Sequence, residues 1–154
     1  METVNSKHFG TLRYECESVI RFPFGLPAFE DETEFLPVEN SVAGAVVFLQ
    51  SLRSPDLLFI TLPVQMVEPS YRLMLLPEEL EALEFPPDAE PRIGRDILCL
   101  VIVTMLPGKP PTVNLMAPIV VNVKNNRAVQ AIQIDSGYNH QCPLTAPAGG
   151  EKAC

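Results

Sequence analysis

Apolar residues along the chain fall into short runs that are separated by turn-forming residues. Residues 46–50 and 57–62 are rich in β-branched and aromatic side chains, and the Ser54-Pro55-Asp56 sequence near their junction is typical of a turn. Residues 97–104 are continuously apolar, which predicts a strand that is buried on both faces. The same reasoning predicts further short strands at residues 2–4, 9–15, 15–22, 35–38, 112–115, 119–123 and 128–134.

Helical periodicity is convincing only at residues 77–84. Pro77 suits the first position of a helix, and the two glutamates that follow it favour the positive end of the helix dipole. Leu76, Leu80 and Leu83 recur with the spacing of a single apolar stripe. A helix of about two turns is stable only when it docks onto the rest of the protein. We therefore predict an all-β fold, a small β-barrel-like domain of short antiparallel strands with one short helix at about residues 77–84.

Residues 22–31, which we call the aromatic loop, do not fit a regular element. They contain three phenylalanines, two prolines and a glycine, which argues against a helix and against a regular strand. We expect an ordered loop packed over a barrel mouth or a sheet end, with its phenylalanines and Leu26 buried. The chain as a whole is expected to form a single domain over residues 1–144, followed by a flexible tail at 145–154.

The charge of the chain is strongly acidic and unevenly placed. Among 154 residues, 19 are Asp or Glu and 11 are Lys or Arg, which gives a net charge of −8. Only Asp135 and Glu151 among the acidic residues lie beyond residue 96. Direct binding to a nucleic-acid backbone is not expected, because phosphate contacts need clustered Lys and Arg. The acidity either keeps the protein soluble or meets a basic partner.

Nothing in the sequence indicates export or membrane insertion. The longest apolar run, residues 97–106, is about half a membrane span, and no charged-then-apolar leader is recognisable. We therefore expect a cytoplasmic protein without a membrane partner.

Groups that carry catalysis or hold cofactors are scarce. The four cysteines fit no zinc-ligand spacing, and neither of the common glycine-rich phosphate motifs occurs, so no enzyme activity, metal or cofactor is expected. His140 and Cys142 could share one face of a strand as a metal-binding or Cys–His pair. An exposed histidine beside a half-buried cysteine at the end of the chain is the favoured interpretation.

Two acidic clusters and two asparagines remain as candidates for contact with a partner. The acids at 30–32 and 78–81 lie in a loop and on the surface of the predicted helix. We expect them to form solvated faces; the alternative interpretation is that they contact a basic partner. Asparagine is disfavoured in strands, so Asn114 and Asn122 use their amides either to satisfy neighbouring backbone groups or to bind a partner. The leucine and isoleucine between them are expected in the core.

Several ordered motifs carry a resemblance to a known family. Residues 22–30 match the pattern F-x-x-G-[LI]-P-G-F-E, except that Ala28 stands where glycine is usual, and residues 49–51, 56–59 and 102–104 match as well. The most specific stretch is 112–122, Thr-x-Asn-Leu-x-Ala-Pro-Ile-Val-Val-Asn, which Gln130 and Tyr138 follow. With these motifs in order, the sequence resembles the bacterial flagellar assembly factor FliW family over residues 2–144.

The resemblance implies a small β-barrel-like fold, no enzymatic activity, and two protein partners. These partners are flagellin and the carbon storage regulator CsrA, a small RNA-binding dimer that represses flagellin translation. A FliW-like protein that is freed when flagellin is exported would bind CsrA beside the RNA site and relieve repression allosterically. Since CsrA must be basic where it holds RNA, we hypothesise that acids of this chain face that side and repel phosphate. The free protein is expected to be a monomer.

The residues expected to contact partners come from the acidic clusters and from the matched C-terminal motifs. They are Glu30, Asp31, Glu32, Glu78, Glu79, Glu81, Asn114, Pro118, Asn122, Tyr138 and His140. A competing hypothesis is a generic β-barrel module that binds a small ligand or another protein, with the aromatic loop as the lid of a pocket.

Overall fold

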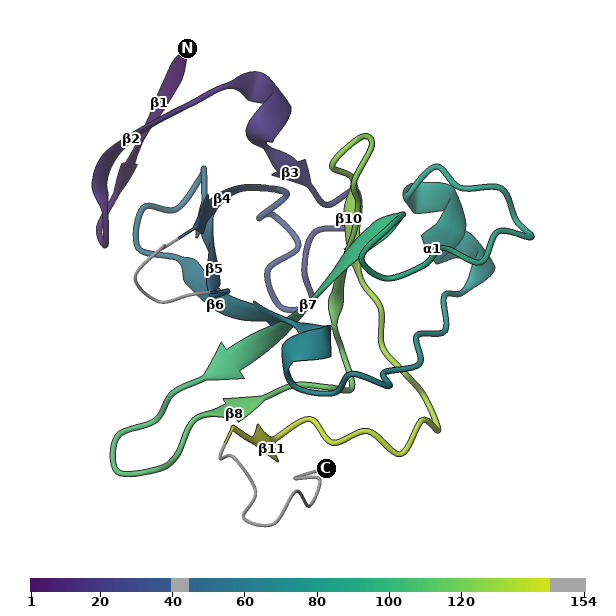
Figure 1. The fold of residues 1–154 in the computed structure, drawn as a ribbon. Coiled ribbons are helices and arrows are strands. Elements are labelled where there is room, and N and C mark those ends of the chain that lie inside the picture. The colour runs from purple at the N-terminus through teal and green to yellow at the C-terminus, as the bar shows by residue number, and fades with distance from the viewer. Residues whose placement is uncertain (40–44, 145–154) are drawn as a thin grey trace.

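The structure confirms an all-β fold with a short α-helix (Figure 1). It is a computed structural model that describes residues 1–39 and 45–144, so the predicted tail lies outside the described residues. The elements are β1 (Glu2–Ser6), β2 (Gly10–Tyr14), η1 (Cys16–Ser18), β3 (Ile20–Arg21), β4 (Glu34–Glu39), β5 (Val47–Ser51), β6 (Leu58–Pro63), η2 (Val64–Met66), α1 (Pro77–Ala82), β7 (Ile97–Thr104), β8 (Thr112–Val113), β9 (Ile119–Asn122), β10 (Ala128–Gln130) and β11 (Cys142–Pro143).

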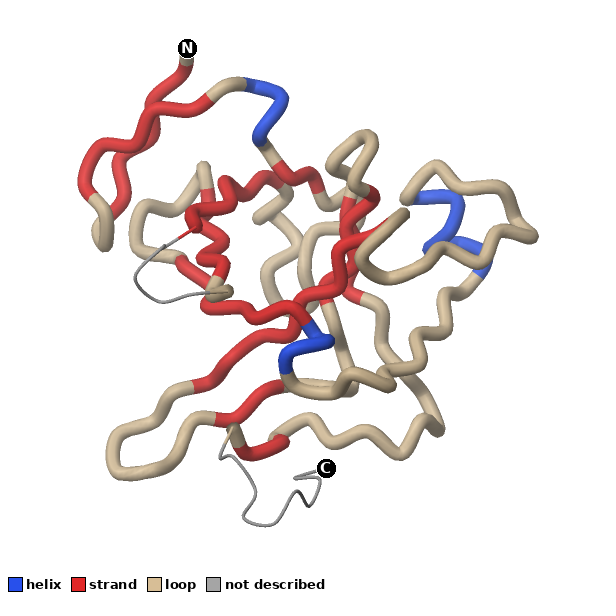
Figure 2. The backbone as a smooth tube through the Cα atoms, viewed as in Figure 1, coloured by secondary structure: helices blue, strands red, loops and turns tan. Residues whose placement is uncertain are grey.

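The main sheet is antiparallel and strongly curled. Its strands follow the order β10-β9-β7-β6-β5-β4-β3, and β8 pairs with both β7 and β11. Figure 2 shows these strands wrapping around a common interior. The two ends of the sheet meet at a single bridge between Arg21 and Arg127, where the Arg21 N–H donates to the Asn126 carbonyl at 2.9 Å. The sheet is therefore barrel-like in its curvature, although no ladder of paired strands closes it within residues 1–39 and 45–144.

Strand β7 is covered on both faces, as its continuous apolar sequence predicts. Leu100 belongs to the cluster inside the curl, together with Phe22, Phe35, Leu49 and Ile119. Val101 belongs to a second cluster on the other face of the sheet, together with Val64, Tyr71, Leu83 and Val120. Because α1 and the segment that precedes it cover this second face, the helix docks directly on the sheet.

Helix α1 is shorter than the predicted range of 77–84 because it ends in a left-handed residue. Glu84 has φ +65°, the Glu84 N–H donates to the Glu81 carbonyl at 3.0 Å, and the Phe85 N–H donates to the Leu80 carbonyl at 2.8 Å. These two bonds form a Schellman motif, which terminates a helix. The expected apolar stripe holds for Leu80 and Leu83, which are buried, but Leu76 precedes the helix and is exposed. No helix in residues 1–39 and 45–144 is long and apolar enough to cross a membrane.

Several predicted strands are shorter in the structure, among them the one expected at 112–115, of which only Thr112–Val113 forms a strand. Residues 15–22 form η1 followed by the two-residue β3, and the strand expected at 128–134 ends at Gln130. The Ala131 N–H donates to the Pro118 carbonyl at 2.9 Å, but Pro118 has no N–H to return the bond. The ladder between β9 and β10 therefore stops at this proline.

The prediction that the aromatic loop buries its apolar side chains is wrong for two of them. Phe22 and Leu26 are buried, whereas Phe24 is 59% exposed and Phe29 is 41% exposed. The loop turns sharply at residues 26–29, where the Phe29 N–H donates to the Leu26 carbonyl at 2.7 Å. This turn leaves two aromatic rings on the surface.

Candidate interaction surface

The exposed face of α1 is acidic. Glu78 and Glu81 are exposed and lie three residues apart, so they occupy one face of the helix. Together with Glu84 they line a shallow groove whose other walls are Pro77, Phe85 and Pro87. Within residues 1–39 and 45–144, neither Glu78 nor Glu81 forms an ion pair with a basic side chain. These two carboxylates are therefore available to a basic partner.

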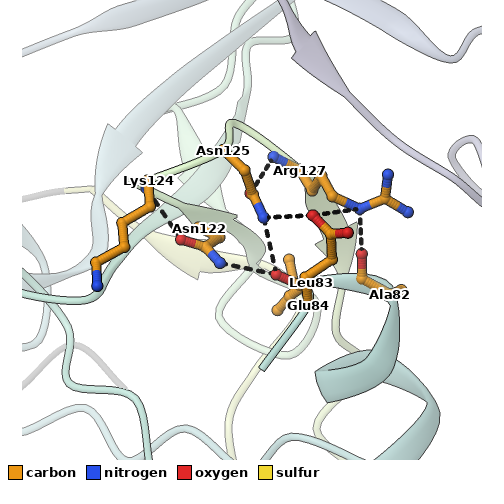
Figure 3. A network of polar contacts seen from close by, with 7 residues as sticks. All are labelled: Ala82, Leu83, Glu84, Asn122, Lys124, Asn125 and Arg127. Atoms are coloured by element: carbon orange, nitrogen blue, oxygen red, sulfur yellow. Dashed lines mark hydrogen bonds and ion pairs between the residues drawn. The ribbon is translucent and has the colours of Figure 1, made fainter. Parts of the chain in front are cut away.

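The turn between β9 and β10 holds the end of α1 in place (Figure 3). The Arg127 Nε donates to the Ala82 carbonyl at 2.7 Å, and the Asn122 Nδ2 donates to the Leu83 carbonyl at 2.7 Å. Asn125 adds a weaker bond to the same Leu83 carbonyl at 3.3 Å. The last carbonyls of a helix lack partners within the helix and carry partial negative charge, so an arginine and two amides stabilise this end.

Glu84 belongs to the same network, and its charge is used within the protein. Its carboxylate accepts a hydrogen bond from the Asn125 Nδ2 at 2.9 Å and lies 3.9 Å from the Arg127 Nε. A non-glycine residue in the left-handed region costs roughly 1 kcal/mol or more. These side-chain contacts offset part of that cost, and they fix the direction in which the chain leaves the helix.

Glu79 does not belong to the solvated face that the sequence predicts. It is 8% exposed, and its Oε1 accepts a hydrogen bond from the Leu76 N–H at 2.8 Å. Burial raises the pKa of this carboxyl; the bond from Leu76 opposes the rise, and the charge of Glu78 adds to it. Glu79 thus caps the start of the helix, and the expectation of a solvent-facing side chain is wrong because the amide of Leu76 draws it inward.

The acids of the aromatic loop divide in the same way. Glu30 and Asp31 are exposed, but Glu32 is buried and accepts hydrogen bonds from the hydroxyls of Ser51 and Ser54. The expectation of a solvated carboxylate is therefore wrong for Glu32, which ties the loop to the end of β5 and the turn after it.

Asn114 and Asn122 both bond to the backbone, which favours the structural alternative. The Asn114 Oδ1 accepts from the N–H groups of Met116 and Ala117 at 3.0 and 3.1 Å. Asn122 is 3% exposed, and its Oδ1 accepts from the Lys124 N–H at 3.0 Å. Pro118 is buried between them, and the neighbouring Leu115 and Ile119 lie in the core, as predicted.

Tyr138 and His140 lie near the C-terminal end of the described chain. The Tyr138 ring stacks on Tyr71 with the ring centroids 4.3 Å apart, and its hydroxyl accepts a hydrogen bond from the Arg72 N–H at 2.8 Å. His140 is exposed, whereas Cys142 is buried where β11 pairs with β8. An exposed imidazole and a buried sulfur do not form a nucleophilic pair, and no group of three potential metal ligands occurs among the described residues.

The comparisons with known proteins agree with one another. The family model described as "FliW protein" matches residues 3–144. The chain belongs to the FliW family. A Bacillus subtilis protein named "Flagellar assembly factor FliW" is 32% identical over 149 residues, which cover 96% of this chain and 97% of that protein. A protein of the same name from Syntrophomonas wolfei is 30% identical over 145 residues, which cover 93% and 88%. A crystal structure of the flagellar assembly factor FliW superposes with a TM-score of 0.82 at 26% identity and covers 96% of this chain and 99% of that one.

In this member of the FliW family, the sequence did not reveal the residues that position α1. Asparagine tolerates a positive φ, so residues 124–127 favour a turn, and Asn126 does have φ +59°. Nothing local to that turn indicates that Asn125 and Arg127 would contact the end of a helix more than forty positions earlier in the chain. That contact depends on the pairing of β9 with β7, which places the turn beside the helix.

Proposed function

We propose that this chain is a non-enzymatic flagellar assembly factor that binds flagellin and CsrA in the cytoplasm and requires no cofactor. By this proposal, export of flagellin frees the protein to bind CsrA, which then releases flagellin mRNA. The observation that carries the proposal is the match to the FliW family over residues 3–144, with relatives that are named flagellar assembly factors. We further propose that the free protein is a monomer.

The acidic surface supports an electrostatic route to RNA release. The exposed acids of the two clusters are Glu30, Asp31, Glu78 and Glu81. Two unit charges about 10 Å apart in water interact by about 0.4 kcal/mol. Several such charges beside an RNA site could together supply the roughly 1.4 kcal/mol that changes affinity tenfold. Acidic residues that dock next to the RNA would thus weaken its binding without occupying its site.

The remaining candidate residues divide into direct contacts and supports. His140 is exposed, and Tyr138 is half-buried, so both can touch a partner. Glu32, Glu79 and Asn122 are buried and bonded within the protein, so in the proposed function they hold the contact surfaces in shape. Asn114 and Pro118 shape the backbone of the C-terminal motif in the same manner.

The direct test is calorimetric titration of the purified protein with CsrA and with flagellin, alone and in succession. We expect binding to each partner, and we expect flagellin added first to reduce binding to CsrA. Failure to bind either partner would overturn the proposed function.

A second experiment isolates the role of charge. Glu78→Gln with Glu81→Gln should weaken RNA release from CsrA more than it weakens CsrA binding, because charge is lost while shape is kept. The matched control is Glu2→Gln with Glu15→Gln, which removes two exposed acids from the region of the N-terminal hairpin. If the helix variant releases RNA as well as the unmodified protein does, the repulsion mechanism is wrong.

A further inference from the structure

The aromatic loop leaves two large apolar side chains substantially exposed. Phe24 and Phe29 are 59% and 41% exposed, although Phe22 and Leu26 in the same loop are buried. Phe29 also makes an edge-to-face contact with Phe59, with ring centroids 5.8 Å apart. Two exposed aromatic side chains on one ordered loop are typical of protein-binding surfaces.

The loop is rigidly built, so the exposure of these rings does not come from a lack of order. The Phe22 N–H donates to the Thr33 carbonyl at 2.8 Å, and the Glu32 N–H donates to the Phe29 carbonyl at 2.9 Å. Gly25 has φ +65°, and a Cβ there would lie 2.4 Å from the Glu30 carbonyl oxygen, so the two arms of the loop are in close contact. A preorganised aromatic surface loses little entropy when a partner binds.

The surroundings of the two rings indicate the chemistry of the partner. A hollow of about 220 Å³ beside Phe29 is lined by Leu57 and by the polar residues Glu32, Ser54 and Asp56. Asp56 is exposed on its wall, and Glu30 and Asp31 are exposed in the loop between Phe29 and Glu32. Basic residues also lie near these segments: the Arg53 guanidinium donates to the Asp31 carbonyl at 3.4 Å, the Lys7 N–H donates to the Pro55 carbonyl at 2.9 Å, and the His8 Nε2 lies 3.3 Å from the Asp56 carbonyl. With Glu32 included, the acids still outnumber Lys7 and Arg53. A hollow with walls from Phe29 and Leu57 and net negative surroundings complements an apolar side chain flanked by lysine or arginine.

We propose that the aromatic loop is a docking surface for a segment of the basic, RNA-binding partner, in which an apolar side chain enters the hollow beside Phe29 and flanking basic residues meet Glu30, Asp31 and Asp56. This inference rests on the proposed function, because it assumes that CsrA binds. It differs from the repulsion mechanism: there, acidic residues weaken the binding of RNA to CsrA, whereas here the loop itself binds CsrA.

The test is calorimetric titration of CsrA into the full-length protein and into Phe24→Ala with Phe29→Ala. Aromatic anchors at the centre of an interface dominate binding, so the double variant should bind at least about tenfold more weakly. The matched control is Met105→Ala with Leu106→Ala, which removes two apolar side chains of similar exposure from the connection between β7 and β8 and should bind within about twofold of the unmodified protein. Phe24→Ala alone, at the more exposed position, keeps the test valid if the double variant folds poorly.

Charge variants test the second half of the proposal. Glu30→Gln with Asp31→Asn should slow association and reduce its dependence on salt, because steering by these acids is lost. If the unmodified protein binds CsrA and the phenylalanine variants bind within about twofold of it, the inference is overturned while the proposed function stands. Equal losses in the phenylalanine variants and in the control would also overturn it. If the unmodified protein does not bind CsrA at all, the proposed contact with CsrA fails and this inference fails with it.

Discussion

Ala28 adopts a backbone conformation that suits glycine, and replacing it should stabilise the protein. Its φ is +68°, and it follows Pro27 in the turn that the hydrogen bond from the Phe29 N–H to the Leu26 carbonyl closes. Proline at the second position and a positive φ at the third position define a type II turn, in which glycine is strongly preferred at the third. The sequence motif, which usually has glycine here, is consistent with this geometry.

The size of the effect follows from two opposing terms. The left-handed conformation costs an L-residue about 1–2 kcal/mol, and glycine removes this cost. The more flexible glycine stabilises the unfolded chain by about 0.4–1 kcal/mol, which offsets part of the gain. We therefore expect Ala28→Gly to raise the free energy of unfolding by about 0.5–1 kcal/mol. For a chain of this size, that gain raises Tm by roughly 1–4 °C.

Urea denaturation followed by circular dichroism measures this change. The midpoint should rise while the m-value stays constant, because the exposed surface does not change. Ala89→Gly is the matched control, since Ala89 is not among the described residues with positive φ, and the substitution there should be destabilising. The reasoning is refuted if Ala28→Gly is no more stable than the unmodified protein, or if both substitutions shift the midpoint in the same direction.

Further predictions concern the helix anchor, the thiols and a buried carboxyl. Asn122→Ala should cost about 1–3 kcal/mol in thermal or urea unfolding, because it removes the buried 2.7 Å hydrogen bond to the Leu83 carbonyl. Asn125→Ala should cost less, because its bond to that carbonyl is longer, at 3.3 Å, and its bonds to Glu84 and to the Arg127 N–H are exposed. Burial raises the pKa of Cys99 to about 12, so peptide mapping after brief iodoacetamide treatment should find the exposed Cys16 labelled and Cys99 unlabelled until the protein unfolds. Because burial raises the folded-state pKa of Glu79, the contribution of this carboxyl to stability falls as pH rises above its unfolded-state pKa of about 4.3. In urea unfolding, the stability of Glu79→Gln relative to the unmodified protein should therefore increase as pH rises above about 4.3, and a difference that does not change with pH would contradict this.

The elements that the sequence predicts well are those determined by local pattern. The continuous apolar run of β7 and the proline and glutamates that begin α1 identify these elements without tertiary information. The end of β10 could not be predicted from its own sequence, because Pro118, which stops the ladder, lies immediately before the neighbouring strand β9. The end of α1 was similarly hidden, since Glu84 adopts a conformation that its residue type disfavours.

The candidate site shows a related limit on arguments from charge. Counting acids treats every carboxylate as surface, but a carboxylate is drawn inward wherever unpaired N–H or O–H donors lie within reach. Glu79 meets the free amide of Leu76 at the helix start, and Glu32 meets the hydroxyls of Ser51 and Ser54. The carboxylate of each such acid is engaged in hydrogen bonds within the protein, so it contributes little to the electrostatic field around the molecule. A partner therefore meets the exposed carboxylates of each cluster, and the electrostatic mechanism depends on where these face rather than on the net charge of −8.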